Sequence, residues 1–309
     1  MNAAQGDNAM KRKSSEYRLL SGLFFKDYGS FRLFFIKKCN RLLIPFLSFY
    51  LVLSVLVPNL LHSLWDVSFD TVTGIASLWA FVWPGTFPNV PIWFLFCLFV
   101  VNLLFWVLVK VLTCWLRRYQ VMAVALVCVL LGIVGLALRE HYQFDIAYVF
   151  KSCESMPFFC FGYLISRRRG LAYIDGIGQK KTVATILVLM TITFLLSAYK
   201  PDASALLYAA SFFISGISGA LMVLFFAKAF RHVPFVSYLG RYSIILLLTH
   251  GVLVRAFAPI CRYLSLHIQP DAAIFIVLFL ILSSYWVVIP FCVKFLPYVT
   301  AQKPLLKER

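Results

Sequence analysis

Long apolar runs separated by short polar or basic stretches repeat along the chain. Most of these runs approach or exceed about 18 residues, the length that a helix needs to cross roughly 30 Å of hydrocarbon. The apolar residues within each run are continuous rather than alternating, which favours helices over the strands of a membrane barrel. The pattern predicts an all-α polytopic transmembrane helical bundle with about eight spans, at residues 42–61, 91–114, 119–138, 146–166, 182–199, 204–227, 239–259 and 272–295.

Composition supports a membrane protein over a soluble one. Hydrophobic residues make up 62% of the 309 positions and charged residues only 13%, against about 25% charged in an average soluble domain. A soluble chain of this length has too little interior to bury every apolar run. We therefore expect the lipid bilayer to be the main partner of the chain.

The basic residues predict which ends of the spans face the cytoplasm. The N-terminal segment carries nine Lys and Arg, whereas the loop at 62–90 carries none, and this alternation continues to the C-terminus. Because cytoplasmic loops are rich in Lys and Arg, both termini are predicted to be cytoplasmic. The predicted organisation is a basic N-terminal segment (1–41), a transmembrane domain (42–297) and a cytoplasmic tail (298–309), in a cell membrane and most simply a bacterial inner membrane.

The net charge of +17 has a topological explanation, because the cations lie in the gaps between apolar runs. We therefore expect no nucleic-acid partner. The eight cysteines show no metal-ligand spacing and most lie inside apolar runs, so we expect packing roles for them and no metal. In the 62–90 loop, the apolar stretch Gly74 to Trp83 is too short to span and predicts an interfacial or re-entrant helix.

Ionisable residues inside predicted spans are candidates for function, because each is costly to place in hydrocarbon. His250 falls near the predicted bilayer midplane, where it can serve as a base, a substrate ligand, a proton relay or a packing residue. Lys151 and Glu154 share a helix face at a spacing of three, and we expect them to pair with each other.

Three cations stand at the cytoplasmic start of the first predicted span: Lys37, Lys38 and Arg41. One interpretation is a positive-inside anchor. The other is a basic patch for a phosphorylated ligand, since Lys and Arg bind phosphate well. The residue pattern does not separate the two.

The residues around this first span resemble the membrane-bound acyltransferase 3 family. In that family S-G-[FY]-[FL] leads through a basic stretch to R-x-L-x-P, and the chain has SGLFFKDYGSFRLFFIKKCNRLLIPFLSFY at 21–50. Three further family elements follow in order and extend the resemblance over nearly the whole chain: PIWFL (91–95), MPFFCFGYLISRR (156–168) and LGRYSIILLLTHGVLV (239–254).

The resemblance implies transfer of an acyl group, often acetyl from acetyl-CoA, to a sugar hydroxyl of a cell-surface polysaccharide or glycoconjugate. It implies that Arg41 is the arginine of the family at the cytoplasmic face and that His250 is its late-span histidine. In this role His250 is a candidate catalytic base, Arg41 a candidate catalytic and donor-binding residue, and Lys37 and Lys38 are candidate ligands for the phosphates of acyl-CoA.

The resemblance begins at what looks like the tail of the family's second span. The family usually has ten spans, and its catalytic histidine ends the first of them. One interpretation is that the coding sequence extends upstream; the other is that the chain is a member without transferase activity.

Two other classes of function fit the same hydropathy pattern. A transporter or flippase for a glycolipid or small solute predicts a polar path and often an internal repeat, and neither is evident in the sequence. A non-catalytic membrane subunit is the third hypothesis.

Overall fold

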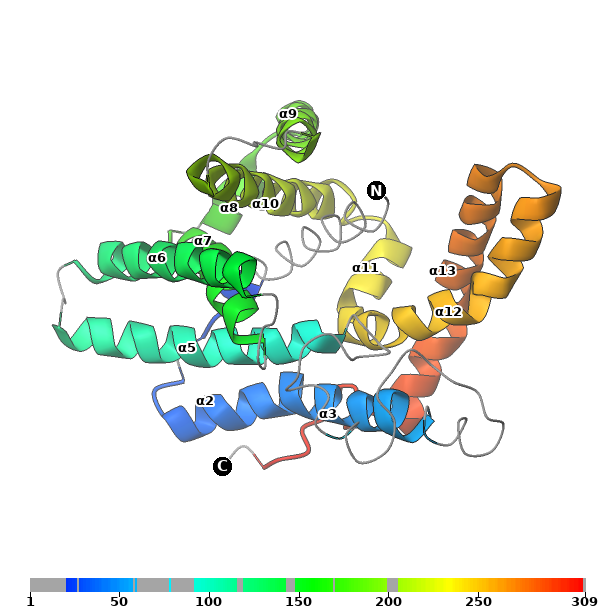
Figure 1. Cartoon of the computed structure of the whole chain (residues 1–309), viewed down its shortest axis with the longest axis horizontal. Helices are drawn as coiled ribbons and strands as arrows, with labels where there is room; N and C mark the ends of the chain where they lie inside the picture. Colours follow the sequence, from blue (N-terminus) through cyan, green and yellow to red (C-terminus); the bar gives the residue numbers. More distant parts are fainter. Residues whose placement is uncertain are drawn as a thin grey trace. The chain divides into compact units, whose positions relative to one another are not determined.

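The computed structural model describes residues 21–26, 28–57, 59, 78, 92–115, 119–142, 148–168, 170–198 and 205–307. Every regular element in these ranges is a helix, as predicted (Figure 1). The chain divides into two compact units. One comprises residues up to Tyr28 and Val100–Ser237; the other comprises Gly29–Phe99 and Tyr238–Arg309.

The second unit begins with a helical segment that is longer than its predicted span. It consists of α2 (Phe31–Lys38), a π-helical turn η1 (Cys39–Leu43), α3 (Ile44–Tyr50) and a second π-helical segment η2 (Leu51–Leu56). Pro45 is accommodated because it lies in the first turn of α3, where its missing N–H removes no α-helical hydrogen bond. The helix therefore starts well before residue 42, and its first turns carry the basic residues.

A helical hairpin completes this unit. It is formed by α12 (Ser243–His267) and α13 (Pro270–Phe295), with α3 also packed against α12. Five of the buried residues of α13 recur every three or four positions, which puts them on one face in a cluster with Ile245 of α12; they are Val277, Ile281, Tyr285, Ile289 and Cys292. A stripe of this spacing is what an apolar helix needs to bury one side.

The predicted span at 239–259 was wrong at both ends. Residues 239–241 belong to a separate short helix, α11 (Pro234–Arg241), and α12 starts only at Ser243. At the other end α12 continues through Pro259 to His267. Proline is tolerated there because neighbouring groups in a membrane bundle can satisfy the backbone carbonyl that it leaves free.

The first unit is built from two helix pairs. In one pair α6 (Gln120–His141) packs against α7 (Val149–Arg167); in the other α9 (Gln179–Ala198) packs against α10 (Ala205–Ala229). The short α8 (Gly170–Gly176) connects the pairs. The longer α5 (Trp93–Trp115) has its first seven residues in the second unit and the remainder here.

Glycine allows α6 and α7 to approach closely. A Cβ on Gly132 would lie 2.3 Å from Cγ of Pro157, and one on Gly135 would lie 2.6 Å from the backbone nitrogen of Glu154. Neither distance is compatible with a side chain larger than hydrogen. Small residues are the usual means of bringing two membrane helices into contact.

Six of the described helices are long and apolar enough to cross a membrane: α5, α6, α9, α10, α12 and α13. The chain is thus a multi-pass membrane protein. The other two predicted spans correspond to residues 42–56 of the first helical segment and to α7. Nine residues of α7 are buried, among them Ser152, Glu154 and Ser155, so neighbouring helices shield its polar side chains. The count of eight spans and the cytoplasmic termini stay predictions, and the stretch predicted as re-entrant, Gly74 to Trp83, lies outside the described residues apart from Leu78.

Candidate functional site

The three predicted cations lie on consecutive turns at the start of the first long helix. Lys37 and Lys38 end α2, and Arg41 lies in the π-helical turn η1. The Nζ of Lys38 is 5.5 Å from the ring centroid of Phe34, whose side chain is fully buried. Removal from water, and then the positive charge of Arg41, lower the pKa of Lys38 from 10.5 to about 8.

An ammonium group that is largely removed from water normally has an anionic partner, because desolvation of an unpaired charge is unfavourable. Among the residues that the structure describes, neither Lys38 nor Arg41 makes an ion pair with a carboxylate. The sequence has no acidic residue between Asp27 and Asp66. The start of this helix is therefore a local excess of positive charge, which suits a phosphorylated ligand.

Asn40 holds the C-terminal tail against this turn. Its side chain is 3% exposed. Nδ2 of Asn40 donates to the backbone oxygen of Leu306 at 2.9 Å, and Oδ1 accepts from the backbone nitrogens of Leu305 at 3.1 Å and Leu306 at 2.8 Å. Sequence reasoning missed this residue, because no local pattern links positions separated by 266 residues. A π-helical turn is itself a frequent marker of functional positions.

His250 lies seven residues into α12, about 10 Å along the helix axis from Ser243. Its Nδ1 is 3.0 Å from the backbone oxygen of Leu246. A carbonyl oxygen can only accept, so Nδ1 carries the proton in this bond. In the neutral ring the other nitrogen, Nε2, then has a free lone pair, which is the form that a general base requires.

Tyr285 of α13 is a second polar side chain at this level, and sequence reasoning missed it. Its ring is 2% exposed, and its hydroxyl lies 3.5 Å from the Leu246 oxygen that also accepts from His250. In the same turn, Oγ1 of Thr249 donates to the backbone oxygen of Ile245 at 2.8 Å. These contacts fix the turn of α12 that carries His250.

The structure brings Lys37, Lys38 and Arg41 together and places His250 in the same unit, on the helix that packs against α3. No hydrogen bond joins the described side chains of His250 and Arg41. Among the residues in the described ranges, no group of three His, Cys, Asp or Glu side chains is placed to hold a metal ion.

Glu154 has a partner that its spacing from Lys151 did not predict. Its carboxylate lies 2.5 Å from a guanidinium nitrogen of Arg139 on α6, and the two side chains are 2% and 11% exposed. The ammonium group of Lys151 lies 5.0 Å from the ring centroid of Tyr148. The Arg139–Glu154 pair belongs to the first unit, and it joins the two helices that Gly135 brings into contact.

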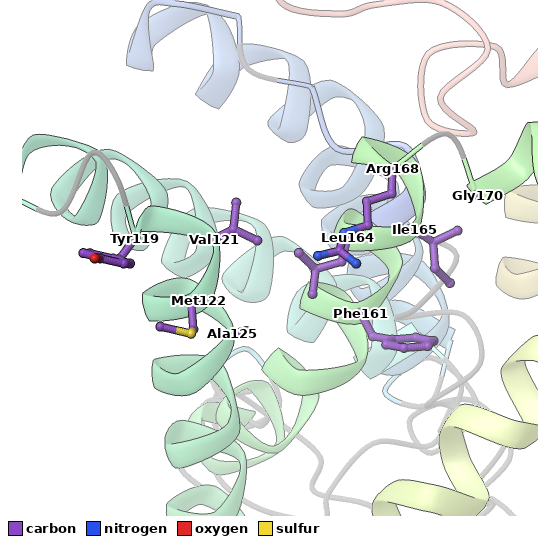
Figure 2. A pocket seen from close by; sticks show the side chains of 9 residues that line it. All are labelled: Tyr119, Val121, Met122, Ala125, Phe161, Leu164, Ile165, Arg168 and Gly170. Carbon is purple, nitrogen blue, oxygen red and sulfur yellow. The ribbon is translucent and has the colours of Figure 1, made fainter.

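An open groove of about 740 Å³ lies at the other end of the same helix pair (Figure 2). Its lining is apolar apart from Tyr119 and Arg168, and the side chain of Arg168 extends along the groove beside Leu164. One cation among mainly apolar residues does not match a ligand with several phosphates. The groove is therefore not our candidate for the donor site.

Comparison with protein families favours one of the classes of function that the sequence left open. A family described as an acyltransferase domain matches residues 18–293, which is well over half of the chain. The chain belongs to the acyltransferase 3 family. It is thus a membrane acyltransferase by family, and the matched range contains Lys37, Lys38, Arg41 and His250. No curated protein and no solved structure matches this family member significantly.

Proposed function

We propose that the protein transfers an acyl group, most simply acetyl, from acyl-CoA to a sugar hydroxyl of a cell-surface polysaccharide or glycoconjugate. The observation that carries this proposal is the cation cluster at the start of the first long helix. A partly desolvated Lys38 beside Arg41, with no carboxylate partner among the described residues, favours a ligand that brings several negative charges. The nucleotide end of coenzyme A is such a ligand.

The donor binds through its phosphates at Lys37, Lys38 and Arg41, and its pantetheine arm extends toward the interior of the same unit. Arg41 offers a planar fork that can grip one phosphate through two hydrogen bonds, and the lysines add compact charges. An extended arm separates the thioester from the phosphates, so the reacting carbon and the cations need not be adjacent.

His250 acts as the base in the transfer step. Its Nε2 takes the proton from the sugar hydroxyl while the hydroxyl oxygen attacks the thioester carbonyl carbon. The carbon–sulfur bond then breaks, and the leaving thiolate of coenzyme A takes the proton from the imidazolium. The Leu246 carbonyl keeps Nδ1 as the donor throughout, and this orients the ring and stabilises its charged form.

Incubation of the reconstituted protein with ¹⁴C-acetyl-CoA and a membrane glycan fraction tests the proposal. The label should appear in the glycan as an ester that mild base releases. We expect His250→Ala and Arg41→Ala to lower transfer by about 100-fold or more, since a positioned base contributes roughly 10²–10⁴-fold.

Matched controls come from the same helix. His267 lies exposed at the far end of α12 and makes the same kind of bond, from Nδ1 to the Tyr263 oxygen at 2.9 Å; Arg262 is also exposed. The variants His267→Ala and Arg262→Ala should transfer label at the wild-type rate. Absence of transfer by the wild-type protein with acetyl-, succinyl- and palmitoyl-CoA alike would refute the proposal, and so would full activity of His250→Ala.

A further inference from the structure

The last described residues of the C-terminal tail are anchored to Asn40 through their backbone. Leu305 and Leu306 are 56% and 43% exposed, and residues 302–307 all lie on the surface. The tail leaves α13 through a turn in which the backbone nitrogens of Gln302 and Lys303 both donate to the Pro297 oxygen. Its next anchor is Asn40, which uses both ends of its amide on Leu305 and Leu306.

The hydrogen bonds of Asn40 select one alignment of the tail against its side chain. An amide side chain that accepts two N–H groups and donates to one carbonyl uses nearly all of its hydrogen-bonding capacity. Because Asn40 is buried, each of these bonds replaces water that cannot reach the group. A shift of the tail by one residue would break the whole set.

The hydrogen bonds at Asn40 also determine where the positive charges of the tail lie. Arg41 follows the Asn40 anchor directly in sequence, and Lys307 follows Leu306, so the tail delivers a further cation next to the start of the first helix. Lys303 is a second exposed cation on the same tail. Between Asp271 and Lys307 the chain has no acidic residue, and Glu308 follows Lys307 directly. The tail that is held against Asn40 therefore adds positive charge beside Arg41, and a bound anion would reduce the repulsion between these cations.

We propose that the C-terminal tail forms part of the donor site, with Lys303 and Lys307 as ligands for the phosphates of the acyl donor and Asn40 as the residue that positions them. This inference rests on the proposed function, because the donor is taken to be acyl-CoA. Lys303 and Lys307 lie outside the matched range 18–293, so family membership does not imply a role for them.

The test measures binding of free coenzyme A and of pantetheine, which lacks the nucleotide phosphates, to the full-length protein in nanodiscs. The double variant Lys303→Ala/Lys307→Ala should weaken coenzyme A binding by about tenfold, the effect of two exposed charge contacts, and leave pantetheine binding unchanged. The control Lys180→Ala/Lys181→Ala removes two exposed lysines of α9 and should bind both ligands as the wild type does.

Asn40→Leu provides an independent arm. The backbone amides of Leu305 and Leu306 donate to Oδ1 of Asn40, so their hydrogen exchange should accelerate in this variant, together with weaker coenzyme A binding. Wild-type amide exchange with unchanged coenzyme A binding in Asn40→Leu would overturn the positioning role.

Different results would contradict the role of the tail and the proposed function. If the double lysine variant binds coenzyme A as tightly as the wild type, or more tightly, while Arg41→Ala loses binding, the tail is not part of the site and the proposed function stands. If the wild-type protein binds no coenzyme A at all, both proposals fall together.

Discussion

The ion pair between Arg139 and Glu154 makes a quantitative prediction about stability. The carboxylate is 2% exposed, its partner is 11% exposed, and the two groups lie 2.5 Å apart. Replacing Glu154 by Gln leaves the guanidinium in a site that excludes water, without its counter-charge. Breaking a buried pair in this way costs roughly 3–5 kcal/mol of unfolding free energy.

Replacing both partners should cost much less. The attraction within a buried pair is largely offset by the cost of removing two charges from water. Replacing both partners with uncharged residues of similar volume therefore often changes the free energy of unfolding little. We therefore expect Arg139→Met/Glu154→Gln to be at least about 2 kcal/mol more stable than Glu154→Gln alone. Lys181→Gln, an exposed charge of the same unit, should stay within about 0.5 kcal/mol of the wild type.

The measurement is a titration of the purified protein from mild detergent into sodium dodecyl sulfate, followed by circular dichroism. The free energies of the wild type, Glu154→Gln, Arg139→Met and the double variant form a thermodynamic cycle. A cost below about 1 kcal/mol for Glu154→Gln, or a double variant as unstable as the single one, would refute the reasoning. Because the predicted site residues all lie in the other unit, the double variant should also retain acyl transfer; a stable but inactive protein would place the pair in the catalytic machinery.

Three further predictions concern single positions. The pKa of Lys38 is about 8 in the folded protein and 10.5 in the unfolded chain, so the unfolded chain holds more protons between these values and the free energy of unfolding rises with pH there. Coenzyme A affinity should fall above about pH 8, because the ammonium group of Lys38 is lost. Isothermal titration at pH 7 and 9 checks this fall in affinity, and Lys38→Gln should not show it. Gly135→Ala should cost about 1–3 kcal/mol in detergent unfolding, because its Cβ meets the Glu154 backbone, whereas Gly176→Ala, with open space around it, should cost far less. Tyr285→Phe should lower acyl transfer less than fivefold, since the 3.5 Å bond that it removes is weak, and a loss like that of His250→Ala would contradict this reading.

The helical class and most of the helix positions could be predicted from the sequence. Hydropathy acts locally, because each apolar run must satisfy its own backbone hydrogen bonds in lipid whatever its neighbours do. The six most apolar helices follow directly from this. The helix boundaries around Tyr242 and His267 could not be predicted, because a short break and an interior proline depend on what packs beside them.

Some of the candidate site residues could also be predicted from the sequence, and others could not. His250, Lys37, Lys38 and Arg41 are visible in sequence, because an ionisable residue in or beside an apolar run contradicts its surroundings. Their roles stay predictions. Tyr285 gave no comparable signal, since a tyrosine in an apolar run is an ordinary packing residue until its hydroxyl is seen to lie near the Leu246 oxygen.

By itself the sequence determined a multi-pass helical membrane protein with a basic start to its first long helix, because hydrophobicity and charge are properties of each residue alone. Only the tertiary structure decided which polar groups meet. The pairing of Glu154 with Arg139 follows from a close helix approach at Gly135, and the capture of the tail by Asn40 joins positions 266 residues apart. Such partners are set by the packing of whole helices, which no local pattern records.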